Sequence, residues 1–87
     1  MSDESVMRFP CSFPIKLMGR ESSVFRQTAR ELVEKHTGPL DDNAIESSFS
    51  RNGRFVAVTK TIVAESREQL DNIYRDATAH DDVIMAL

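Results

Sequence analysis

Apolar and polar residues alternate with a period of two along several stretches of this chain. The alternation runs through residues 13–18, through both sides of Asn52-Gly53 at 45–50 and 55–62, and more briefly through 83–87. A period of two predicts strands that bury one face. Pro14 cannot donate a ladder hydrogen bond, so we expect it among the first residues of its strand, where pairing has barely begun. Gly19 is expected to end that strand by permitting a turn.

Two further stretches place their apolar residues on one face of a helix. In the first, Ser22 or Ser23 is expected to cap the opening turn, and Gly38-Pro39 to end the helix. A second helix is expected to open at Ser66 through a capping box. The two apolar stripes consist of Phe25, Thr28, Ala29, Leu32, Val33 and His36 in the first helix, and of Leu70, Ile73, Tyr74 and Ala77 in the second.

Asn52-Gly53 between two alternating runs predicts a type I′ hairpin turn of two residues. Counting outward from that turn sets Phe49 opposite Val56 and Ile45 opposite Lys60. The face expected to meet the core carries Ile45, Ser47, Phe49, Val56, Val58 and Ile62, with Lys60 among them. The opposite face carries Glu46, Ser48, Ser50, Phe55, Ala57, Thr59 and Thr61.

The order strand, helix, hairpin, helix, strand predicts an α+β ferredoxin-like βαββαβ sandwich. Its four-stranded antiparallel sheet is expected to have the strand order 4-1-3-2, with both helices on one face and the other face open. The 87 residues are enough for one small domain. We expect a flexible tail at residues 1–8 and the ferredoxin-like domain at 9–87.

Composition and charge narrow the classes of partner. The chain is 40% hydrophobic and 29% charged, with a formal net charge of −3. An acidic balance does not attract nucleic acid or an anionic membrane. The apolar runs fall short of the ~20 residues that span a bilayer. The opening MSDESVM carries acids where a secretory signal carries basic and then apolar residues, so a cytoplasmic location is expected.

Residues able to carry catalysis are few. Cys11 is the single cysteine, and only His36 and His80 could serve it as a base. We expect Cys11 to be a bystander thiol beside the first strand. The two histidines lie near aspartate pairs but lack a third ligand at a spacing that secondary structure sets. No catalytic residue, metal site or cofactor is therefore expected, and the chain is not expected to be an enzyme.

The open sheet face holds the candidate binding residues. Lys16 and Met18 are expected on a central strand there, beside Phe55 and Thr61 on the next strand. Glu46 is expected one strand further out, next to Thr59. These side chains could receive a ligand or a partner, although a solvated face on which Lys16 and Glu46 pair weakly through water is the alternative. A nucleic-acid surface would need more exposed aromatic residues than Phe55.

Lys60 is expected to face the helices near the end of the first one. Its apolar stem can pack against neighbours while its ammonium reaches outward. Its expected partners are the carbonyls at the helix C-terminus, or Asp41 and Asp42. A buried ammonium with no partner would be too costly.

Four features of the sequence resemble the YbeD-like family of small bacterial proteins. They are the opening FPxxF followed by K.MG at residues 9–19, His36 before a short loop, the Asn52-Gly53 hairpin, and the ending D.V.M.L at 81–87. The similarity runs from about Phe9 to Leu87. It implies a ferredoxin-like fold close to the ACT domains that sense amino acids. Genes of that family often lie beside lipoate-attachment genes.

Two functions remain open on these grounds. The first is a non-enzymatic regulatory or adaptor domain that binds a protein partner through the open sheet face or an edge strand. The resemblance implies that such a role is linked to lipoate metabolism. The alternative is a small-molecule sensor of the ACT type, with its ligand near the Gly19 loop at the interface of a homodimer.

Overall fold

The computed structural model describes residues 8–87, so the predicted tail lies outside the described residues except for Arg8. The elements along the chain are β1 (Cys11–Arg20), α1 (Ser23–Thr37), a short 3-10 helix η2 (Asp42–Ala44), β2 (Ile45–Phe49), β3 (Phe55–Ala64), α2 (Arg67–Ala79) and β4 (Met85–Ala86). This is the predicted order of strands and helices. The side chains of Ser22 and Ser66 accept hydrogen bonds from Phe25 N and Gln69 N, so they cap α1 and α2.

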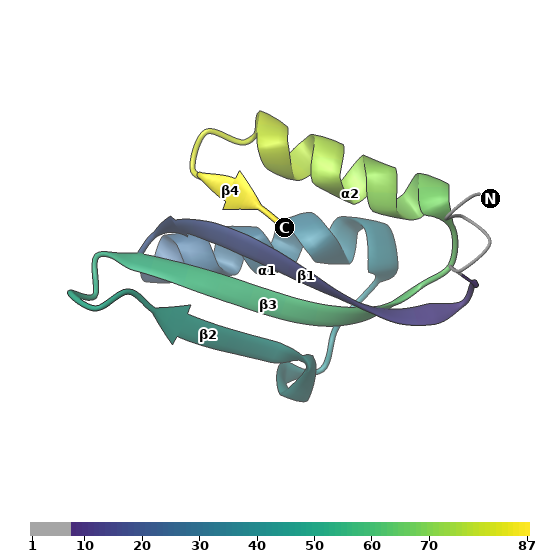
Figure 1. Cartoon of the computed structure of the whole chain (residues 1–87), viewed down its shortest axis with the longest axis horizontal. Coiled ribbons are helices and arrows are strands. Elements are labelled where there is room, and N and C mark those ends of the chain that lie inside the picture. Colours follow the sequence, from purple (N-terminus) through teal and green to yellow (C-terminus); the bar gives the residue numbers. More distant parts are fainter. Residues whose placement is uncertain (1–7) are drawn as a thin grey trace, which may run out of the picture.

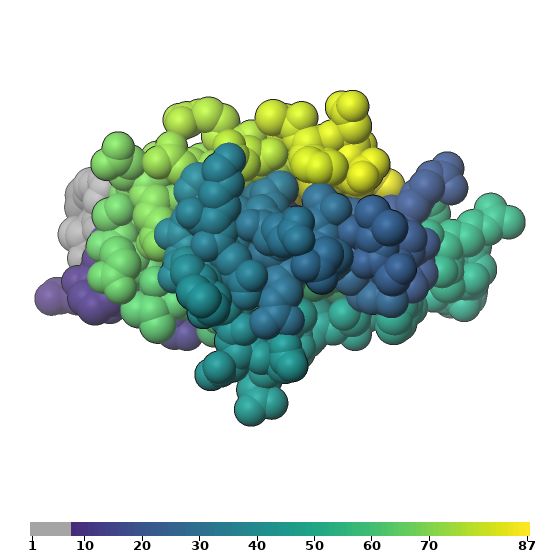
Figure 2. Space-filling view, turned by 180° about the vertical axis from the view of Figure 1, so that it is seen from behind, coloured from purple at the N-terminus to yellow at the C-terminus, as the bar shows by residue number. Residues whose placement is uncertain are grey.

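The four strands form one antiparallel sheet in the order β2-β3-β1-β4. Read from the other edge this is 4-1-3-2, so the predicted ferredoxin-like fold is confirmed. Both helices pack on one face of the sheet, and β4 extends the sheet beside β1 (Figure 1). Seen from behind, α1 lies in front of the sheet (Figure 2). No helix in residues 8–87 covers the other face.

The core lies between the helices and the two long central strands. Its buried apolar residues are Ile15, Leu17, Phe25, Ala29, Val33, Val56, Val58, Ile62, Ala64, Leu70, Ile73 and Ala77. The edge strand β2 contributes little, because both helices contact β3 while neither makes an extensive contact with β2. Phe49 pairs with Val56 as predicted, yet it is 55% exposed. The predicted pairing of Phe49 is therefore right, but the expectation that its side chain is buried in the core is wrong.

Pro14 lies inside β1, which begins earlier than expected, at Cys11. It pairs with Thr61 of β3. Lys16 N donates to the carbonyl of Leu87, and the nitrogen of Pro14, two residues earlier, points to the same edge. The short strand β4 does not extend that far along β1. The proline is tolerated in a central strand because its missing donor would have had no partner there.

Gly19 does not end β1, which continues to Arg20. It is buried on the helix side, opposite Val56. A Cβ at this position would lie 2.5 Å from Cε1 of Phe25 and 2.6 Å from the carbonyl oxygen of Asp82. Glycine is needed here for the close approach of α1 and the loop before β4, and not for a turn.

The hairpin has the predicted register but a different turn. Gly53 N donates to the carbonyl of Ser50 at 2.9 Å, and Ser50 N donates to that of Phe55 at 2.9 Å. Gly53 has a φ of +76°, while no residue other than glycine has a positive φ among residues 8–87. A type I′ turn would need a positive φ at Asn52 as well. The loop therefore spans residues 51–54, which leaves the same strand pairs opposite each other.

Candidate functional site

The register brings six of the seven predicted binding residues onto the open face. Lys16 lies opposite Thr59, and Thr59 lies opposite Glu46 on its other side, so the three form a row across β1, β3 and β2. The others on this face are Met18, Phe55 and Thr61. Gly19 faces the helices instead, and so it does not belong to this surface.

The open face is hollowed at the end where β4 joins the sheet. A depression of about 430 Å³ is lined by Lys16, Met18, Phe55, Ala57, Met85 and Leu87, among others. Met85 and Leu87 are 48% and 59% exposed. The sequence analysis did not include these two residues in the site, although their place opposite Met18 and Lys16 follows once β4 is paired with β1.

Charges surround the apolar centre of this depression unevenly. The guanidinium of Arg20 lies 5.7 Å from the centroid of the Phe55 ring, a cation–π contact at the end of the sheet where β3 begins. The charged side chains that the register places on the open face are Lys16, Arg20 and Glu46. The side chains of this face therefore include two cations and one anion, whereas the side chains of the whole chain sum to a formal net charge of −3.

A separate hollow of about 270 Å³ lies beside Gly19. It is lined by Arg20, Ser22, Phe25, Asp81, Asp82 and Ile84. The loop before β4 and the start of α1 form its walls. A ligand near Gly19, as in the sensor hypothesis, would have to occupy this space, because Phe25 and Asp82 already fill the space directly above the glycine.

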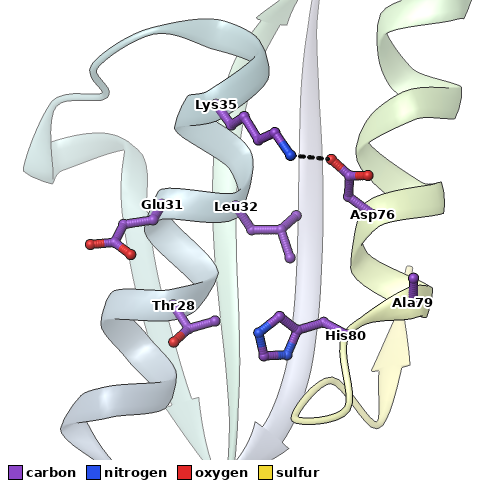
Figure 3. Close-up of a pocket in the computed structure, with 7 residues that line it drawn as sticks. All are labelled: Thr28, Glu31, Leu32, Lys35, Asp76, Ala79 and His80. Atoms are coloured by element: carbon purple, nitrogen blue, oxygen red, sulfur yellow. Dashed lines mark ion pairs between the residues drawn. The ribbon is translucent and has the colours of Figure 1, made fainter.

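A groove of about 410 Å³ runs between α1 and α2 (Figure 3). The ion pair drawn there joins Lys35 Nζ and Asp76 Oδ2 at 3.4 Å, and the same oxygen lies 2.6 Å from His36 Nε2. The hydrogen bond with His36, assisted by Lys35, holds the pKa of Asp76 below its ordinary value. This cluster ties the two helices together, and Glu31 points away from α2 in the same view.

Sequence analysis missed Asp76 as the partner of His36. The two residues are 40 positions apart, and the aspartate lies on the flank of the apolar stripe of α2. Asp76 directly precedes Ala77, a member of the apolar stripe that is buried in the structure. That position could have indicated that the Asp76 side chain lies beside the contact between the two helices.

Cys11 opens β1 opposite Ala64 and is partly buried against the core. In residues 8–87, no three His, Cys, Asp or Glu side chains gather closely enough to hold a metal ion. Within the same described range, no helix has both the length and the apolar character that crossing a bilayer requires.

Lys60 has a different environment from the one expected. Its side chain faces the helices but is only 1% exposed, and its Nζ has no hydrogen-bond partner among residues 8–87. Arg30 takes the acceptors near the end of α1, donating to Glu34 at 3.0 Å and to Asp42 and the Leu40 carbonyl, each at 2.7 Å. The expected contacts of Lys60 with Asp41, Asp42 or the C-terminal carbonyls of α1 are therefore wrong. The guanidinium of Arg30, which has several donors, occupies Asp42 and the Leu40 carbonyl instead. Burial lowers the pKa of Lys60 to about 8.

Comparisons with known proteins agree with this fold. The family described as a protein of unknown function, DUF493, matches residues 4–87. A UPF0250 protein of Nitrosomonas europaea is 40% identical over 87 residues, covering 100% of both chains. One from Chromobacterium violaceum is 44% identical over 89 residues, also with 100% of both chains covered.

The solution structure of protein HP0495 from H. pylori superposes with a TM-score of 0.74 over 93% of this chain and 85% of that one. At 18% identity this likeness concerns the fold alone. The full-length matches at 40–44% identity are consistent with the YbeD-like resemblance of the sequence motifs. The chain therefore belongs to the DUF493 (UPF0250) family of small bacterial proteins.

Proposed function

We propose that this protein is a non-enzymatic regulatory or adaptor domain that binds an acidic segment of a protein partner on its open sheet face. The observation that carries the proposal is the depression of about 430 Å³, in which apolar side chains lie beside Lys16. Its exposed methionine and leucine side chains resemble the centre of an interface more than a solvated sheet.

The chemistry of the depression suits a short anchor from a partner. Met18 and Met85 are unbranched side chains that adapt to the shape of an apolar group. Phe55 supplies a flat apolar wall beside the guanidinium of Arg20. The two long central strands β1 and β3 pair along all ten residues, so the surface is rigid before binding. Little ordering of this face would then oppose association.

Charge selects the class of partner. Lys16 and Arg20 outnumber Glu46 on this face, so an anchor flanked by aspartate or glutamate gains favourable contacts. The lipoate link implied by the YbeD-like resemblance makes a lipoate-attachment protein the first partner to test.

The first prediction concerns capture of that partner. A Lys16→Glu, Phe55→Ala double variant reverses one charge and removes the aromatic wall, so we expect capture from the native host, read by mass spectrometry, to fall by about tenfold or more. Circular dichroism and the melting temperature should stay near those of the wild type, since Lys16 is exposed and Phe55 lies outside the core.

The matched control changes the helix layer in the same way. A Val24→Ala, Arg67→Glu variant also truncates one exposed apolar side chain and reverses one exposed charge, on α1 and α2. It should capture the same proteins as the wild type. Equal capture by the wild type and the open-face variant would contradict the proposal.

The hollow beside Gly19 favours a second candidate, the small-molecule sensor. Arg20 on one side and Asp81 with Asp82 on the other present opposite charges across about 270 Å³, an arrangement suited to a zwitterion such as an amino acid. An increase of melting temperature with one amino acid, lost in Asp82→Asn, would support this function in place of the first.

A further inference from the structure

A fourth hollow, of about 240 Å³, lies between α1 and the β2–β3 hairpin, on the helix side of the sheet. Its polar lining consists of Ser23, Arg26, Gln27, Arg30, Ser47 and Lys60. It is therefore separate from the open face, and partner capture there does not involve it.

Every polar side chain of this lining can donate a hydrogen bond, and none is a carboxylate. The two guanidiniums already have partners, since Arg26 pairs with Glu21, and Arg30 pairs with Glu34 and Asp42. Lys60 differs from them. Its Nζ is buried and has no hydrogen-bond partner within the described part of the chain, although Lys60 is one of the residues that line the hollow.

A buried ammonium without a partner is costly, and an anion beside it relieves that cost. The lowered pKa of Lys60, about 8, still leaves the side chain mostly protonated at neutral pH. The hollow therefore combines a desolvated positive charge with further donors from Ser23, Gln27 and Ser47. Charge-assisted hydrogen bonds of this kind are the strong ones in anion recognition.

We propose that this hollow binds the oxyanion of a small ligand, a phosphate or carboxylate group, with Lys60 Nζ as its principal donor. The serine hydroxyls and the glutamine amide complete the contacts around the anion. Arg26 and Arg30 add positive potential without leaving their own carboxylates.

Binding should weaken as the pH rises through about 8, where Lys60 loses its proton. The charged groups that act on Lys60 are Arg30 and Glu34 of α1, with Asp42 of η2 held by Arg30. The residues opposite Lys60 in the sheet, Ile15 of β1 and Ile45 of β2, have uncharged side chains. The pKa of Arg30 is raised and that of Glu34 is lowered, so the charge that changes near pH 8 is that of Lys60.

The test titrates the wild-type protein with sodium phosphate, and separately with sodium acetate, at constant ionic strength. The chain has three lysines, Lys16, Lys35 and Lys60, so the NMR signals of their Cε methylenes can be assigned. We expect the Lys60 signal to shift saturably and its pKa to rise, while the other two signals stay in place.

Thermal unfolding in the same buffers gives a second readout. The anion should raise the melting temperature of the wild type and of Lys35→Met, a matched change at an exposed lysine. In Lys60→Met the apparent affinity for the anion should fall by about tenfold or more.

Response to phosphate alone assigns a phosphate-bearing ligand, and response to acetate alone assigns a carboxylate. If neither anion moves the Lys60 signal, or if Lys60→Met responds as the wild type does, the proposal is overturned. The NMR titration uses the unaltered protein, so it decides the matter even if a variant fails to fold. It also leaves the open-face proposal untouched, since that proposal is tested by capture of a protein.

Discussion

Lys60 is a charged side chain that the fold buries, with no hydrogen-bond partner for its ammonium in residues 8–87. Its pKa falls from an ordinary 10.5 to about 8, which corresponds to a cost of about 3 kcal/mol while both the folded and the unfolded chain hold the proton. Methionine has a similar length and no charge. We therefore expect Lys60→Met to be more stable than the wild type at about pH 7 in anion-free buffer.

The advantage of Lys60→Met should shrink as the pH rises. Between about pH 8 and 10.5 the unfolded chain retains a proton that the folded chain has released, so the wild type gains stability with pH and the variant does not. Urea unfolding at about pH 7 and about pH 9.5 measures this difference. Burial also raises the pKa of Tyr74. Tyr74 is present in both proteins, so its contribution cancels in the difference between their free energies of unfolding. A difference in free energy of unfolding that is independent of pH would contradict the burial of a charged Lys60.

At the scale of elements, the contact between α1 and α2 depends on one carboxylate. Asp76 Oδ2 lies within 2.6 Å of His36 Nε2 and 3.4 Å of Lys35 Nζ. We expect Asp76→Asn to lower the urea midpoint at neutral pH. Asp71→Asn on the same helix should change it little, because Asp71 is exposed and its pair with Arg67 is long, at 3.9 Å.

The effect of Asp76→Asn should also depend on pH. The folded-state pKa of Asp76 is below the ordinary 3.8, so its stabilising contribution is present above 3.8 and is lost as the pH falls through the folded-state value. The wild type and the variant should therefore converge in acid. Equal urea midpoints for Asp76→Asn and Asp71→Asn at neutral pH would show that the helices do not rely on this contact.

At the scale of the whole molecule, the open face has two cationic side chains and one anionic side chain, on a chain of formal net charge −3. Association with an acidic partner should therefore slow as salt rises from about 0.05 M to about 0.5 M, because exposed charges are screened. Surface plasmon resonance can measure this with the captured partner. Lys16→Met should reduce the salt dependence of the association rate, whereas Phe55→Ala should mainly speed dissociation. An association rate that does not change with salt would contradict an acidic partner.

Local geometry was enough to predict the elements, the strand order and the pairing of β2 with β3. Alternation, helical stripes and the caps at Ser22 and Ser66 are set by neighbours a few residues apart, and these can be counted along the chain. The turn at Gly53 was predicted in the wrong type, yet the register survived because both loops leave the same strand pairs opposite each other. Four of the candidate binding residues, Glu46, Phe55, Thr59 and Thr61, followed from that register, and Lys16 and Met18 followed from the alternation along β1.

Only the tertiary structure decided the contacts between segments that are distant in the chain. Gly19 is required by Phe25 and Asp82, which meet above it from α1 and from the loop before β4. Lys60 Nζ has no hydrogen-bond partner among the described residues, and Arg30 occupies the nearby acceptors, Asp42 and the Leu40 carbonyl. His36 bonds to Asp76 on the other helix. Such contacts depend on how helices and strands pack in three dimensions, and no short-range pattern encodes which of several equally charged side chains arrives at a given acceptor. The sequence by itself determined the scaffold and its exposed face, while packing decided which polar groups are paired and left the Lys60 ammonium buried with no hydrogen-bond partner among residues 8–87.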